Sequence, residues 1–200
     1  MYDVLIVGAG AAGMSCALVL GSAKTKPFAE SKRVGLMAHQ RTSHLQDAIF
    51  NNVLGLAPGT LGADVLVQGK AQLHTLYPHV DQIENEKVRS ILKTSDGFAV
   101  TTNKMTYSSK IIVVAVGYTN LINIKGLESY IEPHPQAAVA KERIWLKNEN
   151  HLIADGLYVA GTLAGGRSQF AIASGSGAQV ATDILTLWNN GKDTHVHDKI

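Results

Sequence analysis

Cysteine is nearly absent from this chain of 200 residues, and that scarcity excludes several kinds of site. Cys16 is the only cysteine, so the chain can form no internal disulfide, no Cys-x-x-Cys redox pair and no metal site built on several thiols. The histidines show no metal-ligand spacing either, since His195 and His197 lie together in a polar tail without further ligands. We therefore expect no metal site. We expect Cys16 to be a small buried packing residue.

Long apolar runs and clusters of one charge are also missing. No apolar run approaches the roughly 20 residues that a membrane-spanning helix needs. The first residues lack the basic region of a signal peptide, because Asp3 stands there. Charged residues make up 17% of the chain, the net charge is +2, and lysine and arginine are scattered. These features predict a cytoplasmic protein with no nucleic-acid or membrane partner.

A glycine-rich motif follows the first predicted strand. Residues 2–7 form a nearly continuous apolar run, which is typical of a strand buried on both faces of a parallel sheet. The sequence GAGAAG follows at residues 8–13, and residues 14–20 have the composition of a helix. This is the Gly-x-Gly-x-x-Gly pattern between a strand and a helix. It predicts dinucleotide binding but does not distinguish FAD from NAD(P).

Each residue type in this motif has a physical role. Gly8 permits the sharp turn, Gly10 lets a pyrophosphate approach the backbone, and Gly13 lets the helix pack on the strand. Ala11 and Ala12 complete the predicted cofactor loop. The backbone amides and the helix dipole then provide a site for an anion.

The acidic residue that usually binds the adenosine ribose in such a fold is missing. It normally ends the second strand. Here the predicted second strand, residues 33–38, ends at Ala38 and continues with His39, Gln40 and Arg41. His39 and Arg41 could accept a 2′-phosphate, which would indicate NADP. Alternatively, backbone groups and Gln40 hold the ribose, or these are ordinary loop residues.

The remaining chain alternates short strands, turns and helices. The predicted segments are a loop over residues 51–62, a helix over 63–76, a small antiparallel β-meander over 87–107, buried strands over 111–116 and 157–160, and a helix over 169–188. We therefore predict an α/β fold of the Rossmann type with a central parallel sheet, as one domain over residues 1–188. Residues 189–200 are predicted to be a frayed polar tail. Gly175 and Gly177 within the last helix indicate close approach of a ligand or another backbone.

Three patches, in this order, carry a family resemblance. Residues 3–18 (DVLIVGAGAAGMSCAL) are similar to an FAD pyrophosphate fingerprint, and residues 111–117 (IIVVAVG) to a strand that ends in an ATG-type turn. Residues 156–181 (GLYVAGTLAGGRSQFAIASGSGAQVA) are similar to the closing segment beneath the flavin. Residues 50–59 take the place of a loop near the isoalloxazine ring. The chain resembles the FAD-binding part of the thioredoxin-reductase-like pyridine nucleotide–disulfide oxidoreductases.

The resemblance implies FAD as the cofactor and assigns residues to it. The three motif glycines would hold the pyrophosphate, and Gly117 would turn the chain close to the cofactor. Gly161 and Thr162 would lie near the ribityl chain and the pyrophosphate.

The same resemblance places the start of the last helix at the flavin ring. Gln169, Phe170 and Ala171 would lie by the pyrimidine edge, where a helix N-terminus favours negative charge on the reduced ring. Such stabilisation raises the tendency of the flavin to accept a hydride. No side chain stands out as a catalytic acid or base.

The departures from the family pattern limit what is implied. Thr162 replaces an expected aspartate, and Ala38 stands where the ribose acid is expected. Only about forty residues separate Gly117 from Leu157, and no second glycine fingerprint exists. The family's NAD(P)H domain and its Cys-x-x-Cys are therefore missing. This implies a flavin-binding half that is not a thioredoxin reductase.

We expect an FAD-dependent oxidoreductase that transfers a hydride or electrons at the flavin to or from a small substrate or a redox partner protein. NAD(P)H is a candidate donor. Two alternatives stay open: a non-enzymatic flavin-binding sensor, carrier or subunit of a larger redox complex, and an NAD(P)-binding dehydrogenase. The missing neighbour domain should leave apolar surface exposed, which predicts a homodimer.

Overall fold

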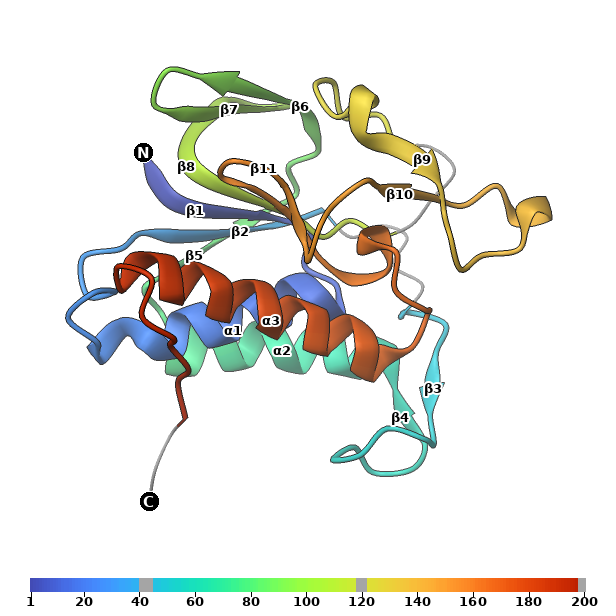
Figure 1. Ribbon diagram of the computed structural model, residues 1–200. Coiled ribbons are helices and arrows are strands. Elements are labelled where there is room, and N and C mark those ends of the chain that lie inside the picture. The colour runs from blue at the N-terminus through green and yellow to red at the C-terminus, as the bar shows by residue number, and fades with distance from the viewer. Residues whose placement is uncertain (40–44, 118–121, 198–200) are drawn as a thin grey trace.

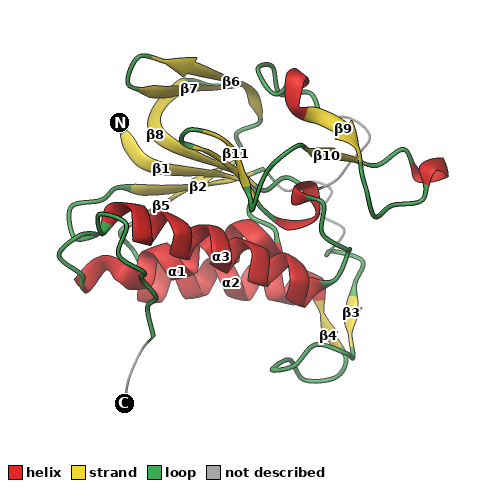
Figure 2. Cartoon of the chain, viewed as in Figure 1, coloured by secondary structure: helices red, strands yellow, loops and turns green. Residues whose placement is uncertain are grey.

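One mixed sheet forms the centre of the fold in the computed structural model, which describes residues 1–39, 45–117 and 122–197 (Figures 1 and 2). The spatial order of its main strands is β11, β12, β8, β1, β2, β5. Their bounds are Leu152–Ala154, Leu157–Val159, Thr106–Val114, Tyr2–Val7, Val34–Ala38 and Val80–Glu84. All neighbours in this order pair in parallel except β11, which is antiparallel to β12. The predicted α/β fold with a central parallel sheet is confirmed.

Three helices cover one face of this sheet (Figure 1). They are α1 (Ala11–Ser22), α2 (Gly62–Leu76) and α3 (Phe170–Trp188). Side chains alternate along each strand, so Val4 and Ile6 of β1 enter the core beneath the helices, whereas Leu5 and Val7 enter a second core on the opposite face. Burial on both faces explains why β1 reads as a continuous apolar run.

The antiparallel meander lies on the side of the sheet away from the helices (Figure 1). It consists of β6 (Val88–Thr94), β7 (Gly97–Thr102) and the first half of β8. The last part of the predicted meander, residues 87–107, and the strand predicted over residues 111–116 therefore share one strand, β8. Its first half pairs with β7, and its second half pairs in parallel with β1 and β12.

Two short hairpins lie outside the main sheet. One pairs β3 (Ile49–Phe50) with β4 (Thr60–Leu61), and the other pairs β9 (Ile131–Pro133) with β10 (Ile144–Leu146). A short 3-10 helix, η4 (Gly161–Ala164), follows β12, and similar turns are η1 (Ala23–Thr25), η2 (Glu128–Tyr130) and η3 (Val139–Lys141). Strands of two or three residues are too short to produce a periodic sequence pattern. The β3–β4 hairpin was therefore not predicted, and β4 lies within the loop predicted over residues 51–62.

The prediction of a frayed tail is wrong for residues 189–197. The Thr194 amide donates a hydrogen bond to Thr186 Oγ1 at 3.1 Å, and Asn189 Nδ2 donates to Thr194 Oγ1 at 2.9 Å. Thr194 is buried, and Val196 packs against the helical core. These contacts hold the segment on α3 despite its polar composition.

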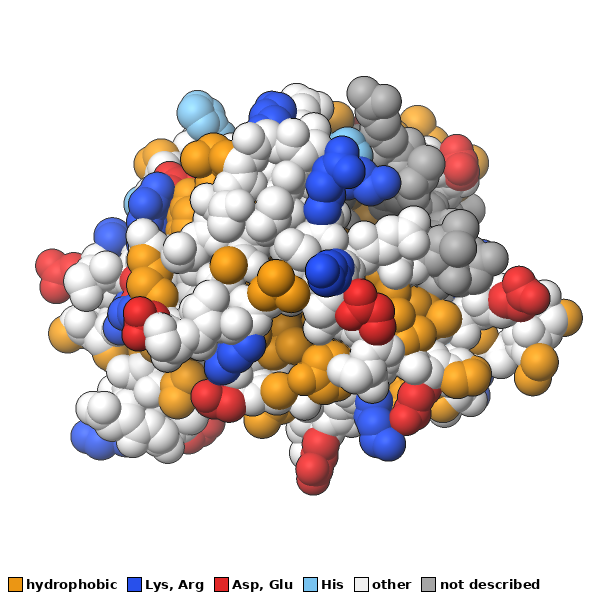
Figure 3. Space-filling view, turned by 90° about the horizontal axis from the view of Figure 1, so that it is seen from above, with side chains coloured by type: hydrophobic (Ala, Val, Ile, Leu, Met, Phe, Trp, Pro, Cys, Tyr) orange, Lys and Arg blue, Asp and Glu red, His pale blue; other side chains and the backbone are white. Residues whose placement is uncertain are grey.

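Charged side chains of both signs are interspersed over the face seen in Figure 3. None of the described helices combines the length and the hydropathy of a membrane-spanning helix. Within the described residues, no group of three or more histidine, cysteine, aspartate or glutamate side chains is arranged to hold a metal ion.

Candidate cofactor site

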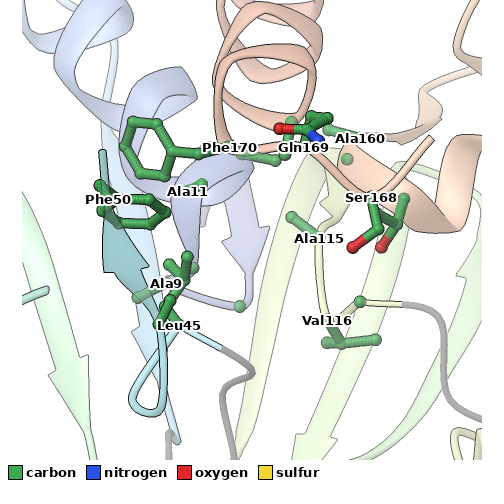
Figure 4. A pocket seen from close by; sticks show the side chains of 18 of the residues that line it. Ala9, Ala11, Leu45, Phe50, Ala115, Val116, Ala160, Ser168, Gln169 and Phe170 are labelled. Carbon is green, nitrogen blue, oxygen red and sulfur yellow. The ribbon is translucent and has the colours of Figure 1, made fainter. Parts of the chain in front are cut away.

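A cleft of about 450 Å³ lies where β1, β8 and β12 end and α1 and α3 begin (Figure 4). The carboxyl ends of parallel strands are the usual place for a ligand in an open α/β sheet. Most of the predicted cofactor residues line this cleft: Gly8, Gly10, Ala11, Ala12, His39, Gly117, Gly161, Thr162, Gln169 and Phe170. Segments that are far apart in the sequence therefore meet here.

Three predicted residues do not line the cleft. Gly13 lies beneath the loop, where an added Cβ would overlap the carbonyl oxygen of Gly8, in keeping with its predicted role in packing the helix on the strand. Ala38 is buried at the end of β2, and Ala171 is exposed outside the cleft lining. The predicted site residue Gln40, like Arg41, lies outside the described residues.

Gly8 and Gly10 have different reasons to be glycine. Gly8 has φ +109°, and an added Cβ would stand 2.5 Å from the carbonyl oxygen of Ala115, the residue directly after β8. Gly10 has an ordinary φ of −77°, and no described protein atom lies within 4 Å of the place where its Cβ would be. The backbone at Gly10 is thus open to a ligand, as expected where a pyrophosphate must come close.

The N-termini of α1 and α3 both reach this cleft without a cap. The N-cap residues Gly10 and Gln169 make no side-chain capping hydrogen bond, and neither first turn contains an acidic residue. The first N–H groups of a helix have no intrahelical partner, and the helix dipole adds partial positive charge there. Two such termini at one cleft suit a ligand with separate anionic parts. A flavin dinucleotide has such parts in its pyrophosphate and in its ring when reduced.

An aromatic pair joins the β3–β4 hairpin to the start of α3. The rings of Phe50 and Phe170 lie with centroids 4.8 Å apart and a 52° angle between planes, a tilted arrangement that aromatic pairs favour (Figure 4). Both residues line the cleft. This contact brings the loop predicted to lie near the isoalloxazine ring to the helix predicted to lie at its pyrimidine edge.

Sequence reasoning missed several lining residues, most of which are small or apolar. They are Ala9, Leu45, Ala48, Ile49, Ala115, Val116, Ala160, Ser168 and Ala173. Phe50 and Asn52, which also line the cleft, belong to the loop predicted to lie near the isoalloxazine ring. Position was the available signal for some of them, because Ala115 and Val116 precede Gly117 at a strand end and Ala160 precedes Gly161. Alanine carries no chemistry of its own, so its residue type gave no indication of a site.

The cleft contains little charge. Among the described lining residues, His39 is the only one with an ionisable side chain. Cys16 lies outside the cleft on α1 and is fully buried, as predicted. Burial raises the pKa of its thiol far above the ordinary value. A thiolate is the reactive form of cysteine, so Cys16 is a packing residue.

Comparisons with known proteins identify the family of this chain. A family model described as "Pyridine nucleotide-disulphide oxidoreductase" matches residues 2–166. A curated relative, the ferredoxin–NADP reductase of Limosilactobacillus fermentum, is 32% identical over 117 residues, which are 58% of this chain and 34% of that protein. The chain thus matches about a third of the length of that relative.

Solved structures share the fold at low sequence identity. The match to a thioredoxin reductase from Gloeobacter violaceus has a TM-score of 0.74 at 12% identity. It covers 100% of this chain and 98% of that reductase chain. The match to a ferredoxin-flavin thioredoxin reductase from Clostridium acetobutylicum has a TM-score of 0.68 at 18% identity. It covers 94% of this chain and 98% of that reductase chain. With most of the chain matched by the family model, the chain belongs to the pyridine nucleotide-disulphide oxidoreductase family, and its cofactor is FAD.

Proposed function

We propose that this chain is an FAD-dependent oxidoreductase that passes a hydride or electrons between its flavin and a small substrate or a redox partner protein. The observation that carries the proposal is the convergence of two uncapped helix N-termini on one cleft. FAD, when bound, supplies the redox chemistry, and the protein supplies binding, orientation and electrostatics.

The residues of the cleft divide these tasks. The open backbone at Gly10 and the first turn of α1 are suited to the pyrophosphate. The first turn of α3, which begins at Phe170 after Gln169, is suited to negative charge at the ring. Apolar side chains such as Leu45, Phe50 and Val116 line the cleft and would help to displace water from a bound cofactor.

We propose that the enzyme does not act as a thioredoxin reductase. Exchange with a disulfide needs an accessible thiolate and a second thiol, whereas Cys16 is single and buried. The name of the Limosilactobacillus fermentum relative indicates ferredoxin and NADP as its reactants. NADPH is therefore the first donor to test, with a redox protein as a second possible partner.

The visible absorption spectrum of the purified protein tests this function. We expect flavin bands, and we expect them to bleach when NADPH is added without oxygen. Bands that persist with NADH and NADPH would move the search to a partner protein as donor. A protein that holds no flavin after FAD is added would contradict the proposal.

A non-enzymatic FAD carrier or subunit is the second candidate. Apart from His39, the described cleft lining contains no ionisable side chain. This favours a carrier or subunit, because substrate chemistry often needs an acid or a base. Firm FAD binding without reduction by any donor would select it. Because the cofactor is FAD, a flavin-free NAD(P)-binding dehydrogenase is not proposed.

We further propose that the protein forms a homodimer in the cytoplasm. Apolar side chains are exposed on the β3–β4 hairpin and on α2, notably Ile49, Leu54, Leu61 and Val67. Burial of such surface against a second copy would stabilise a dimer. Sedimentation at micromolar concentration tests the assembly, and a strictly monomeric species would overturn it.

A further inference from the structure

The η4 turn at the cleft is held by side chains that lie outside the cleft. Thr162 and Gly161 line the cleft, and the same turn continues to Ala164. The carbonyl oxygen of Thr162 accepts a hydrogen bond from His134 Nε2 at 2.9 Å. The carbonyl oxygen of Ala164 accepts one from Asn148 Nδ2 at 3.2 Å. These two contacts, at residues 162 and 164, hold the side of the turn near the β9–β10 hairpin.

The hydrogen-bonding roles of the two His134 ring nitrogens follow from their partners. The backbone N–H of Gln136 donates to His134 Nδ1 at 3.1 Å, so Nδ1 is an acceptor. Nε2 then carries the hydrogen that is donated to Thr162. His134 is buried, with 6% of its surface exposed. Loss of the imidazole would remove this buried donor and leave the Thr162 carbonyl oxygen with the Gly165 N–H, at 3.1 Å, as its remaining donor.

Packing supports the same turn from the neighbouring strand. Trp145 of β10 lies against Gly165, where an added Cβ would stand 2.8 Å from Trp145 Cε3. Gly165 has φ +97° and ends η4. The β9–β10 hairpin therefore contacts the turn through both hydrogen bonds and an aromatic ring.

We infer that His134 is a positioning residue for FAD. Through the Thr162 carbonyl it holds the η4 turn in the conformation that the cofactor meets, without touching the cofactor itself. Asn148 supports the same turn at Ala164. The inference rests on the binding of FAD in this cleft and extends the proposed function to a residue far from the glycine motif in sequence.

The test compares His134→Ala, His134→Gln and a matched control. His79→Ala is the control because His79 Nε2 makes the same kind of contact, 3.0 Å from the carbonyl oxygen of Gly21, outside the cleft lining. Flavin fluorescence released on dilution of the holoprotein gives the FAD dissociation constant, and the visible spectrum reports the surroundings of the bound ring.

We expect His134→Ala to raise the FAD dissociation constant about tenfold and to shift the flavin bands. His134→Gln retains an N–H donor and should restore most of the affinity. His79→Ala should leave both readouts unchanged. Unchanged affinity in His134→Ala, or an equal loss in His79→Ala, would overturn the inference.

A second variant covers the case in which His134→Ala does not fold. Asn148→Ala removes the side-chain hydrogen bond to the Ala164 carbonyl oxygen, and it should also weaken FAD binding severalfold; wild-type affinity in this variant would overturn the inference. The two proposals fail differently. A wild-type protein without FAD contradicts the proposed function, whereas tight FAD binding that is insensitive to these substitutions contradicts only the positioning role.

Discussion

Gly177 of α3 lies directly against Ala12 of α1, so closely that an added Cβ would overlap the backbone carbonyl of Ala12. This contact allows the two helices to pack side by side with both N-termini at the cleft (Figure 1). It also confirms that close approach of another backbone explains one of the two helical glycines noted in the sequence. Gly175 differs, because it is exposed with no described atom within 4 Å of its Cβ position.

Alanine substitutions at these two glycines should have opposite effects. Gly177→Ala should lower the free energy of unfolding by about 1–3 kcal/mol, because α3 must move away from α1. Gly175→Ala, the matched control, should raise it by up to about 1 kcal/mol through better helix propensity. Urea denaturation of both variants measures the two changes. Equal stability of the two variants would show that the contact with Ala12 is unimportant.

Gly10→Ala should separate cofactor binding from folding. The backbone at Gly10 has φ −77°, which alanine adopts readily, so the substitution should cost the apoprotein at most about 1 kcal/mol as a poorer N-cap. The new methyl group would occupy the space open to the ligand, and we expect FAD affinity to fall at least about tenfold, as for a loss of 1.4 kcal/mol. Calorimetric titration with FAD and thermal melting measure these effects. An unchanged affinity would exclude Gly10 from the pyrophosphate site.

Phe50→Ala should release the β3–β4 hairpin from α3. The lost aromatic contact with Phe170 and the space left behind should increase proteolytic cleavage within residues 51–59 severalfold, with weaker FAD binding. Leu54→Ala is the control, because Leu54 is on the same hairpin and fully exposed. Limited proteolysis of the holoprotein compares them. Similar cleavage of Phe50→Ala and wild type would contradict the anchoring role of the aromatic pair.

Asp3 should contribute to stability in a pH-dependent manner. Burial alone would raise the pKa of its carboxyl group, but hydrogen bonds from the Arg33 amide at 3.0 Å and Lys110 Nζ at 2.9 Å, together with nearby Lys32, lower it overall. A lowered folded pKa means that the stabilisation is fully present above the ordinary value of 3.8 and is lost as the pH falls through the folded pKa.

Asp3→Asn should therefore lower the free energy of unfolding by about 1–2 kcal/mol at pH 7. The difference from wild type should shrink as the solution becomes more acidic than pH 3.8. Asp155→Asn is the control, since that carboxylate is fully exposed beside Lys93. Denaturant titrations at several pH values measure the difference. A pH-independent loss in Asp3→Asn would contradict the ionic origin of the stabilisation.

The parts of the fold that could be predicted from sequence are those with local signals. The glycine motif with its flanking strand and helix is set by conformational demands within residues 2–20, so its outline was correct. The edge strand β5 was not predicted, because its sequence VDQIE is half-exposed and weakly apolar. Its pairing with β2 depends on partners more than forty residues away.

The residues that line the cleft could be predicted only where their residue type or their position next to a motif indicated a role. Gly161 and Phe170 were found through a resemblance, whereas Ala48 and Ala173 carry no recognisable signal. The support from His134 was also missed, because its partner is a backbone carbonyl 28 residues away. Such a contact exists only once the chain has folded, and no residue type encodes it.

The position of β1 between β2 and β8 has a consequence for how the chain reaches its native state. Tyr2 pairs with Ser109, so one neighbour of the first strand is supplied from beyond the middle of the chain. On a ribosome, the apolar β1 emerges long before that neighbour is synthesised. Closure of the sheet around β1 is therefore a late event with high contact order, and sheets of this type form slowly. Until residue 109 has been synthesised, that side of the apolar β1 has no strand to pair with.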